Sequence, residues 1–261
     1  MESENDFLKL QIRRARELVA TGYYNARPRM AVPEHPELTY GIRMSHDFPI
    51  IAEVKLATPQ NGVISSTSAR DLIEDYITGG AAGLSVLTEP TSFEGSLTIL
   101  ENVKDPDMPV LMKDFIVSEQ QLEAAKRFGA SAVLLIQGIF DIEGGKESRD
   151  ALVSQAHELG LEVLLEGHGE LELKRIMESE ADIIGINQRN LHDLTIAKGH
   201  AMKLLPMVGR DDRQIVVLSG IHTKREIMDF RDAWADAVLI GTELASNNSP
   251  KTRLMQLAVM R

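Results

Sequence analysis

The sequence contains no cysteine, a single tryptophan and few aromatic residues, which make up only 5% of the chain. Without cysteine there is no disulfide, thiolate nucleophile, cysteine-ligated zinc site or iron–sulfur cluster. No apolar run approaches the roughly 18 residues that span a bilayer, and the first residues are acidic, unlike those of a signal peptide. These absences predict a cytoplasmic protein that does not enter a membrane.

Basic residues are also scarce. Lysine and arginine number 28 against 39 aspartates and glutamates, so the formal net charge is −11. A chain this acidic is repelled by nucleic acid and by anionic membrane surfaces. The 43% hydrophobic content is sufficient for a sizeable core. We therefore expect a globular protein with neither nucleic acid nor a membrane as a partner.

Residues 1–48 differ in pattern from the rest of the chain. Apolar residues recur at helical spacing from Leu8 to Val19 and predict an amphipathic helix over about residues 5–20. Three prolines between positions 28 and 36 then predict an irregular segment. The region is too short for a core of its own. We expect an N-terminal helical arm, residues 1–48, that covers a domain formed by residues 49–261.

From residue 49 onward, short apolar runs alternate with amphipathic segments. Near-continuous apolar character is typical of parallel strands buried on both faces. Eight such βα units in roughly 210 residues predict an α/β fold, a (β/α)8 TIM barrel with a helical extension, and a doubly wound open sheet is the competing fold. Ser249 and Pro250 predict the start of a last helix. The expected strands are 49–54, 83–88, 109–112, 131–136, 161–166, 182–186, 215–218 and 237–240, and the expected helices include 67–79, 118–128, 147–159, 169–179 and 223–232.

Charged residues stand at the ends of the first and third expected strands, where the chemistry of such barrels gathers. Glu53 and Lys55 are two residues apart and therefore lie on one face of a strand. Lys113 reaches the same rim from the third strand. A structural ion pair or a solvated loop lysine would explain each residue alone, but two rim lysines together favour an anionic substrate.

Further polar residues follow the fifth and sixth strands. Glu166 comes directly after an apolar run, where desolvation raises the pKa of a carboxyl group and suits it to acid–base work. Asn187 can orient a hydroxyl group and Arg189 can bind a carboxylate, although both also suit a capped turn. His168 lies near Glu166, but no third ligand at metal-binding spacing appears, so we expect a loop histidine and no metal site.

Small residues follow the last two strands. Ser219 and Gly220 follow the seventh, and Gly241 and Thr242 follow the eighth. Loops at these places form the phosphate site of many barrels, because bare backbone N–H groups approach the anion closely. The strand ends together predict a small, phosphorylated and carboxylated substrate, and leave the reaction open.

Two segments carry a more specific signal: Met-Lys-Asp-Phe at 112–115 and Gly-Ile-Asn-Gln-Arg-Asn-Leu at 185–191. With matching segments from 50–59 to 237–244 in the same order, the chain resembles the indole-3-glycerol phosphate synthase family. The resemblance covers about residues 49–245, and the N-terminal arm has the expected length. A generic phosphate-binding barrel is not expected to carry both segments.

The resemblance implies a carboxy-lyase of tryptophan biosynthesis. Its substrate would be 1-(2-carboxyphenylamino)-1-deoxyribulose 5-phosphate, an anthranilate-derived small molecule whose ring closes with loss of CO2 and water. No cofactor is implied. A monomer and a complex with other tryptophan-pathway enzymes are both compatible with it.

The resemblance also implies roles for individual residues. Lys113 would be the general acid and Glu166 its partner acid or base. Lys55 would contact the carboxylate, and Glu53 and Asn187 would orient the lysines and the substrate hydroxyl groups. The implied substrate-binding residues are Thr58, Phe93, Glu94, Phe115, Leu134, Arg189 and Leu191, and the implied phosphate-binding residues are Ser219, Gly220, Gly241 and Thr242.

Several positions depart from the family pattern. Leu218 replaces the usual glutamate after the seventh strand, Gln60 and Glu94 replace a serine and an asparagine, and Thr242 replaces a serine. Glu94 would restore the carboxylate missing at Leu218 if both faced the barrel mouth. These departures leave two other readings open: a related phosphate-binding barrel with an altered substrate, and a catalytically silent partner of a pathway enzyme.

Overall fold

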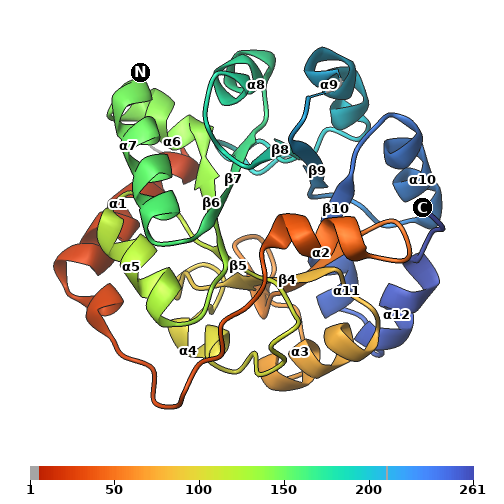
Figure 1. Cartoon of the computed structure of the whole chain (residues 1–261), viewed down its shortest axis with the longest axis horizontal. Helices are drawn as coiled ribbons and strands as arrows, with labels where there is room; N and C mark the ends of the chain where they lie inside the picture. Colours follow the sequence, from red (N-terminus) through yellow and green to blue (C-terminus); the bar gives the residue numbers. More distant parts are fainter. Residues whose placement is uncertain (1–5, 210) are drawn as a thin grey trace.

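The computed structural model describes residues 6–209 and 211–261, and its centre is a closed barrel of eight parallel strands (Figure 1). Because β1 pairs with both β4 and β10, the sheet has no edge, which excludes the open doubly wound sheet. Each strand lies within about a residue of its expected position. The strands are β1 (Ile50–Val54), β4 (Gly83–Leu87), β5 (Val110–Lys113), β6 (Ala132–Ile136), β7 (Glu162–Gly167), β8 (Ile183–Asn187), β9 (Gln214–Leu218) and β10 (Ala237–Ile240).

Helices surround the barrel, and the five expected between strands are all present. Ser249 occupies the N-cap position of the last helix and Pro250 its first turn, although the serine side chain makes no capping hydrogen bond. The outer helices are α3 (Ala69–Thr78), α4 (Leu97–Leu100), α5 (Glu119–Arg127), α6 (Gln137–Ile142), α7 (Gly145–Glu158), α8 (Glu170–Met177), α9 (His200–Val208), α10 (Lys224–Asp232), α11 (Thr242–Ala245) and α12 (Pro250–Leu257). A small hairpin, β2 (Ala57–Thr58) and β3 (Gly62–Val63), follows β1.

Side chains alternate along each strand between the barrel interior and the surrounding helices. Ile51, Leu111, Leu164 and Val216 belong to one buried cluster inside the barrel, whereas their neighbours pack against the helices. Because side chains on a strand alternate with a period of two, the next interior positions on these strands lie two residues further along the chain. They fall at the carboxyl ends of the strands and are occupied by Glu53, Lys113, Glu166 and Leu218.

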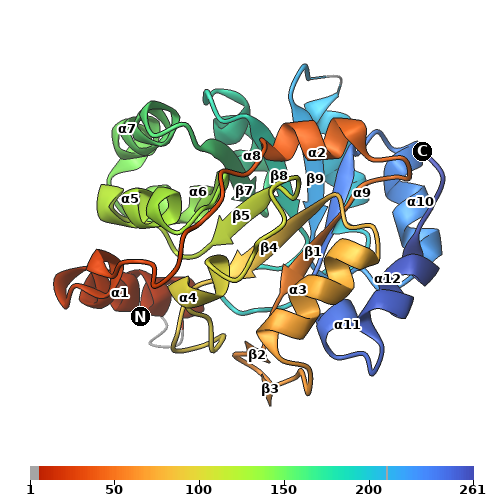
Figure 2. The ribbon, with the colours of Figure 1, turned by 60° about the horizontal axis from the view of Figure 1, so that its bottom comes forward.

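The N-terminal arm reaches both ends of the barrel (Figure 2). Helix α1 (Phe7–Ala20) lies at the carboxyl ends of the strands, where the backbone N–H of Phe7 donates to the carbonyl of His192 at 2.9 Å. A short 3-10 helix, η1 (Tyr23–Asn25), follows it. Helix α2 (Leu38–Met44) lies at the opposite end, where Leu38 and Ile42 join the interior cluster.

Helix α2 corrects the expectation of an irregular segment over the whole stretch after residue 20. The helix packs directly against the barrel. A Cβ at Gly41 would overlap the carbonyl oxygen of Ala82 and the ring of Pro109. Glycine therefore allows this helix to close the amino-terminal ends of the strands. The seven-residue helix depends on these tertiary contacts more than on its own propensity.

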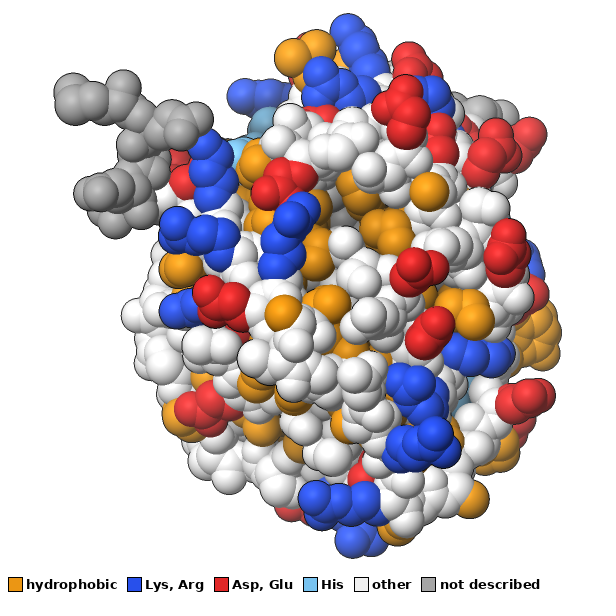
Figure 3. Space-filling model, turned by 90° about the vertical axis from the view of Figure 1, so that its left-hand side faces the viewer, with side chains coloured by type: hydrophobic (Ala, Val, Ile, Leu, Met, Phe, Trp, Pro, Cys, Tyr) orange, Lys and Arg blue, Asp and Glu red, His pale blue; other side chains and the backbone are white. Residues whose placement is uncertain are grey.

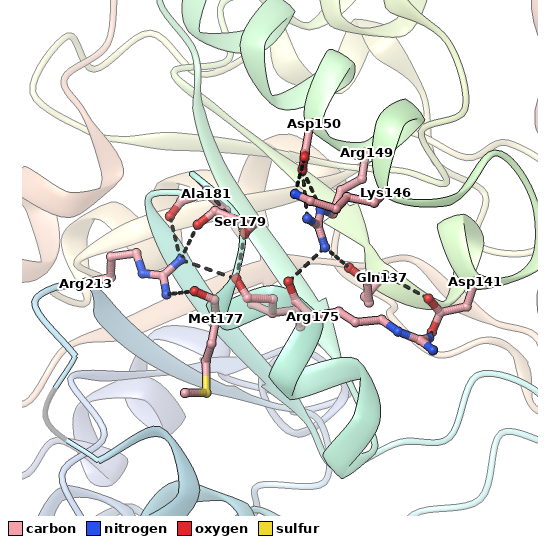
Figure 4. A network of polar contacts seen from close by, with 11 residues as sticks. Gln137, Asp141, Lys146, Arg149, Asp150, Arg175, Met177, Ser179, Ala181 and Arg213 are labelled. Atoms are coloured by element: carbon pink, nitrogen blue, oxygen red, sulfur yellow. Dashed lines mark hydrogen bonds and ion pairs between the residues drawn. The ribbon is translucent and has the colours of Figure 1, made fainter.

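Two arginines, one buried and one partly exposed, fix α6, α7 and α8 around β7 (Figure 4). Arg149 is 1% exposed and donates to Gln137 Oε1 at 3.2 Å and to the carbonyl of Arg175 at 2.8 Å. Arg213 donates to the carbonyls of Met177 and Ser179, at 3.1 and 2.8 Å, where α8 ends. These bonds satisfy carbonyls that a helix end leaves without partners.

The outer surface carries charges of both signs. Acidic and basic side chains are interspersed on the face shown in Figure 3. No helix in residues 6–209 and 211–261 has the length and apolar character needed to cross a membrane.

Candidate active site

A cluster of three charged residues stands at the carboxyl ends of β1 and β5. Lys55 Nζ donates to Glu53 Oε1 at 3.1 Å, and Lys113 Nζ lies 3.3 Å from Glu53 Oε2. The side chains of Glu53, Lys55 and Lys113 are only 4%, 14% and 15% exposed. The same-face placement expected for Glu53 and Lys55 is present, and both point toward the barrel axis.

The three groups titrate differently because their surroundings differ. Burial alone would raise the pKa of Glu53, but the ammonium groups of Lys113 and Lys55 overcome it and lower the pKa to about 2. Burial lowers the pKa of Lys55, and Glu53 offsets this only in part. Burial also acts to lower the pKa of Lys113, but Glu53 and Glu166 together raise it. Lys113 is therefore the lysine held most firmly in its charged form.

Glu166, at the end of β7, is the second acid–base candidate. It is 2% exposed, and Asn187 Nδ2 donates to its Oε1 at 3.1 Å. Its Oε2 is buried and has no hydrogen-bond partner among the described residues. Burial raises the pKa of Glu166, although the charge of Lys113 and the bond from Asn187 oppose the shift. A carboxyl group with a raised pKa and a free oxygen suits proton transfer.

Aromatic side chains form the wall beside these charges. The ring of Phe115 lies 6.1 Å from that of Phe7 and 6.3 Å from that of Phe93, measured between centroids. Lys55 Nζ stands 5.4 Å from the centroid of Phe93. Phe7 comes from α1, so the N-terminal arm supplies part of this wall. Such a surface accepts a flat apolar group next to a cation.

These residues enclose a cavity of about 110 Å³, here called the main cavity. Most of the residues expected at the site line it, and they come from all eight strands of the barrel or the loops after them. They are Glu53, Lys55, Thr58, Phe93, Lys113, Phe115, Leu134, Glu166, Asn187, Arg189, Leu191, Ser219 and Thr242.

A neighbouring cavity of about 210 Å³, here called the glycine cavity, contains the remaining two small residues, Gly220 and Gly241. Ser219 and Gly220 both have left-handed backbone conformations, with φ of 70° and 68°. A non-glycine residue in that conformation is strained, and such strain gathers at functional sites. A Cβ at Gly241 would overlap Glu53 Oε1, so glycine here also lets the β10 loop contact the charged cluster.

The structure shows where two departures from the family pattern lie, Leu218 and Glu94. Leu218 faces the barrel interior and is fully buried, so no carboxylate exists at that position. Glu94 is exposed and lines neither the main nor the glycine cavity. Its backbone, with φ of 52°, turns the β4 loop while its side chain lies outside the barrel mouth. Glu94 therefore does not replace the missing group.

Two other residues at the site, Asp114 and Gln60, were given no role on the basis of the sequence. Asp114 lines the main cavity and accepts hydrogen bonds from Thr88 Oγ1 and, at 3.0 Å, from the hydroxyl of Tyr24 in the arm. Burial raises the pKa of Asp114 to about 6 against these bonds. Gln60 Oε1 accepts from Arg189 Nη1 at 3.3 Å and so links the loops after β1 and β8.

His168 takes the structural role expected of it. Its Nδ1 bonds the carbonyl of Asn187 at 2.8 Å, and its ring stacks on that of His200 with 4.3 Å between centroids. Within residues 6–209 and 211–261, no cluster of three or more His, Asp or Glu side chains is arranged to hold a metal ion.

Comparison with known proteins agrees with this geometry. The family model described as indole-3-glycerol phosphate synthase matches residues 7–257. The chain belongs to the indole-3-glycerol phosphate synthase family. It is 32% identical over 258 residues to the indole-3-glycerol phosphate synthase of Roseiflexus sp. (strain RS-1), covering 95% of this chain and 94% of the relative. It is 37% identical over 202 residues to that of Haloarcula marismortui, covering 77% of this chain and 73% of the relative.

The fold of this indole-3-glycerol phosphate synthase family member also occurs in a solved structure. The chain matches a mutant tryptophan synthase alpha-subunit from Pyrococcus furiosus with a TM-score of 0.62 and 12% identity, covering 82% of this chain and 99% of that one. At this identity the likeness concerns the barrel fold alone.

Proposed function

We propose that the chain is an active carboxy-lyase of tryptophan biosynthesis that makes indole-3-glycerol phosphate. It closes the ring of 1-(2-carboxyphenylamino)-1-deoxyribulose 5-phosphate with loss of CO2 and water. The observation that carries the proposal is the convergence of Lys55, Lys113 and Glu166 on one cavity with an aromatic wall. Membership of the family supports the same reaction.

Lys113 is the general acid for ring closure. The ketone oxygen gains negative charge as the aromatic carbon attacks the ketone carbon, and a buried ammonium group can deliver a proton to it. Glu53 contacts Lys113 and favours its charged form, which keeps a proton available. Lys55, at the Phe93 side of the cavity, binds the substrate carboxylate until it leaves as CO2.

Glu166 acts in the dehydration step. It removes the proton that the ring methylene loses when the hydroxyl group departs, and Asn187 holds the carboxylate in place. Phe93, Phe115 and Leu134 hold the aromatic ring against the ketone carbon, a proximity effect that lowers the barrier by several kcal/mol.

The glycine cavity binds the phosphate group. Backbone N–H groups at Ser219, Gly220, Gly241 and Thr242 approach the anion, with Arg189 on the same wall. A cytoplasmic location, a monomeric state and a complex with other tryptophan-pathway enzymes stay predictions.

The test is to supply the ribulose phosphate substrate and follow indole fluorescence, for which the single Trp234 gives a low background. We expect product at a useful rate from the wild type, and a loss of roughly 100-fold or more in kcat for Lys113→Met and for Glu166→Gln. Tight, phosphate-dependent binding without product would favour an altered substrate, to which the buried Leu218 points. No binding would favour a silent partner.

A further inference from the structure

Glu166 lines a further cavity besides the main one. This side cavity has a volume of about 190 Å³ and lies between the loops after β7 and β8, beside α1 and α6. Its lining includes Leu8, Gly138, His168, Gly169, Glu172 and His192, none of which lines the main cavity. Glu166 and Asn187 stand in the wall that the two cavities share.

The side cavity is large enough to contain water, and polar side chains form part of its lining. A polar cavity needs only roughly 10–15 Å³ to hold one water molecule, and this one has about 190 Å³. The carboxylate of Glu172 lines it and accepts a hydrogen bond from the backbone N–H of His168 at 2.6 Å. At its outer end the side chain of His192 is 44% exposed, so the lining extends from a buried carboxyl group to the surface.

The chemistry of the proposed function requires a proton from solvent in every cycle. Ring closure forms a bond between the carboxylate-bearing ring carbon and the ketone carbon, and the ketone oxygen takes up one proton. The bond to the carboxylate then breaks, CO2 leaves, and its electron pair restores the aromatic ring. Dehydration delivers a second proton to the departing hydroxyl group and recovers one from the ring methylene. Two protons are delivered and one is recovered, so each turnover takes up one.

The substrate obstructs the direct route for that proton. In the proposed function the aromatic half and the sugar chain occupy the main cavity, which Lys113 and Glu166 both line. A substrate in the main cavity also leaves no space in that cavity for the water formed by dehydration. Lys113 also lines the glycine cavity, which the phosphate occupies in the proposed function, whereas Glu166, with its unpartnered buried Oε2, lines the side cavity.

We propose that the side cavity is a second access route to Glu166, through which protons and water pass between the site and solvent while substrate occupies the main cavity. The inference rests on the proposed function. Gly138 and Gly169 keep the route open. A Cβ at Gly169 meets no atom within 4 Å, and a Cβ at Gly138 would point between Leu8 Cδ2, at 3.0 Å, and Glu172 Oε1, at 3.7 Å.

The test narrows the side cavity from two directions and leaves the main cavity unchanged. Gly169→Ala, →Val and →Leu form a series of increasing size at a position with an ordinary negative φ of −108°. Gly138→Ala narrows the cavity from α6 and serves as the second variant if the leucine fails to fold. Glu170→Leu places the same side chain one residue along, on an exposed position outside the cavity, and is the matched control.

The readouts are kcat, KM and the solvent deuterium isotope effect on kcat. We expect kcat to fall progressively along the series, to about a fifth or less for Gly169→Leu, with KM unchanged and a larger isotope effect. Glu170→Leu should match the wild type in all three. If the wild type turns over and both Gly169→Leu and Gly138→Ala keep its kcat and isotope effect, the proposed access route is wrong. The proposed function would still stand in that case. No turnover by the wild type would overturn the proposed function, and the route with it.

Discussion

The carboxylate of Glu53 lies within 3.3 Å of the ammonium group of Lys113, and both side chains are almost entirely buried. Burial acts to lower the pKa of Lys113, and Glu53 opposes it more strongly than Glu166 does. Without Glu53, only Glu166 would oppose this effect of burial. Lys55, which Glu53 also contacts, would then be a second largely buried cation that has lost its ion pair. The single carboxylate thus sets the charge state of both lysines.

Glu53→Gln should therefore lower the pKa of Lys113 and move the alkaline limb of the kcat/KM profile to lower pH. We also expect a loss of at least about tenfold in kcat/KM at neutral pH, because Glu53 orients both lysines as well as favouring the charged form of Lys113. The profile is measured by indole fluorescence from pH 6 to 10, a range that lies below the raised pKa of Lys113 in the wild type. Glu143→Gln, which removes a half-exposed carboxylate paired with Arg16, serves as the control. A Glu53→Gln profile that matches the wild type throughout this range would show that Glu53 does not set the charge of Lys113.

A substitution at Gly241 tests the position of the Glu53 carboxylate from the loop after β10. Because a Cβ at this position would overlap Glu53 Oε1, Gly241→Ala must displace either the carboxylate or the β10 loop. We expect a fall of roughly tenfold or more in kcat/KM from this single methyl group. Thermal unfolding of the same variant distinguishes displaced geometry from loss of the fold. Wild-type kinetics in a folded Gly241→Ala would mean that the cluster tolerates movement.

The strands and the placement of the charged site could be predicted because both follow from local pattern. Apolar runs marked each strand, and the two-residue period placed Glu53 and Lys55 on one face before any contact was known. The carboxyl ends of parallel strands meet at one rim, which brought Lys113 and Glu166 to the same cavity.

The rest depended on contacts between residues far apart in the chain. Tyr24 bonds Asp114 across 90 positions, and neither residue stands in a pattern that indicates the other. Helix α2 is buried because it packs against the amino-terminal ends of the strands, a contact that its own sequence does not indicate. Glu94 lies in a loop, where no period fixes which way a side chain points, so the sequence could not show that it lines neither cavity.

Asp114 should make stability depend on pH in a recognisable way. Its pKa is raised to about 6 from 3.8, so the folded state binds a proton more tightly than the unfolded state. Stability from this group is therefore greatest at low pH and is lost as pH rises through about 6. Between pH 7 and pH 5 we expect the wild type to gain on the order of 1 kcal/mol relative to Asp114→Asn.

Urea unfolding of the two proteins at pH 5, 6 and 7 measures this difference. The comparison with Asp114→Asn cancels the contributions of other carboxyl groups, among them Glu53, whose pKa is lowered and whose effect has the opposite sign. If the free energy of unfolding changes with pH by the same amount in the two proteins, the result would contradict the raised pKa of Asp114.

The buried guanidinium of Arg149 gives a prediction about the scaffold. Arg149→Ala removes the donor to Gln137 and to the carbonyl of Arg175, and leaves buried polar groups of α6 and α8 without partners. We expect a loss of about 2–4 kcal/mol in the free energy of unfolding. Arg149 also forms an ion pair with Asp150, which Lys146 contacts from an exposed position. Lys146→Ala should therefore cost less than about 0.5 kcal/mol. Urea midpoints at constant m-value provide the measurement, and equal losses in the two variants would mean that the buried bonds of Arg149 contribute no more than a surface ion pair.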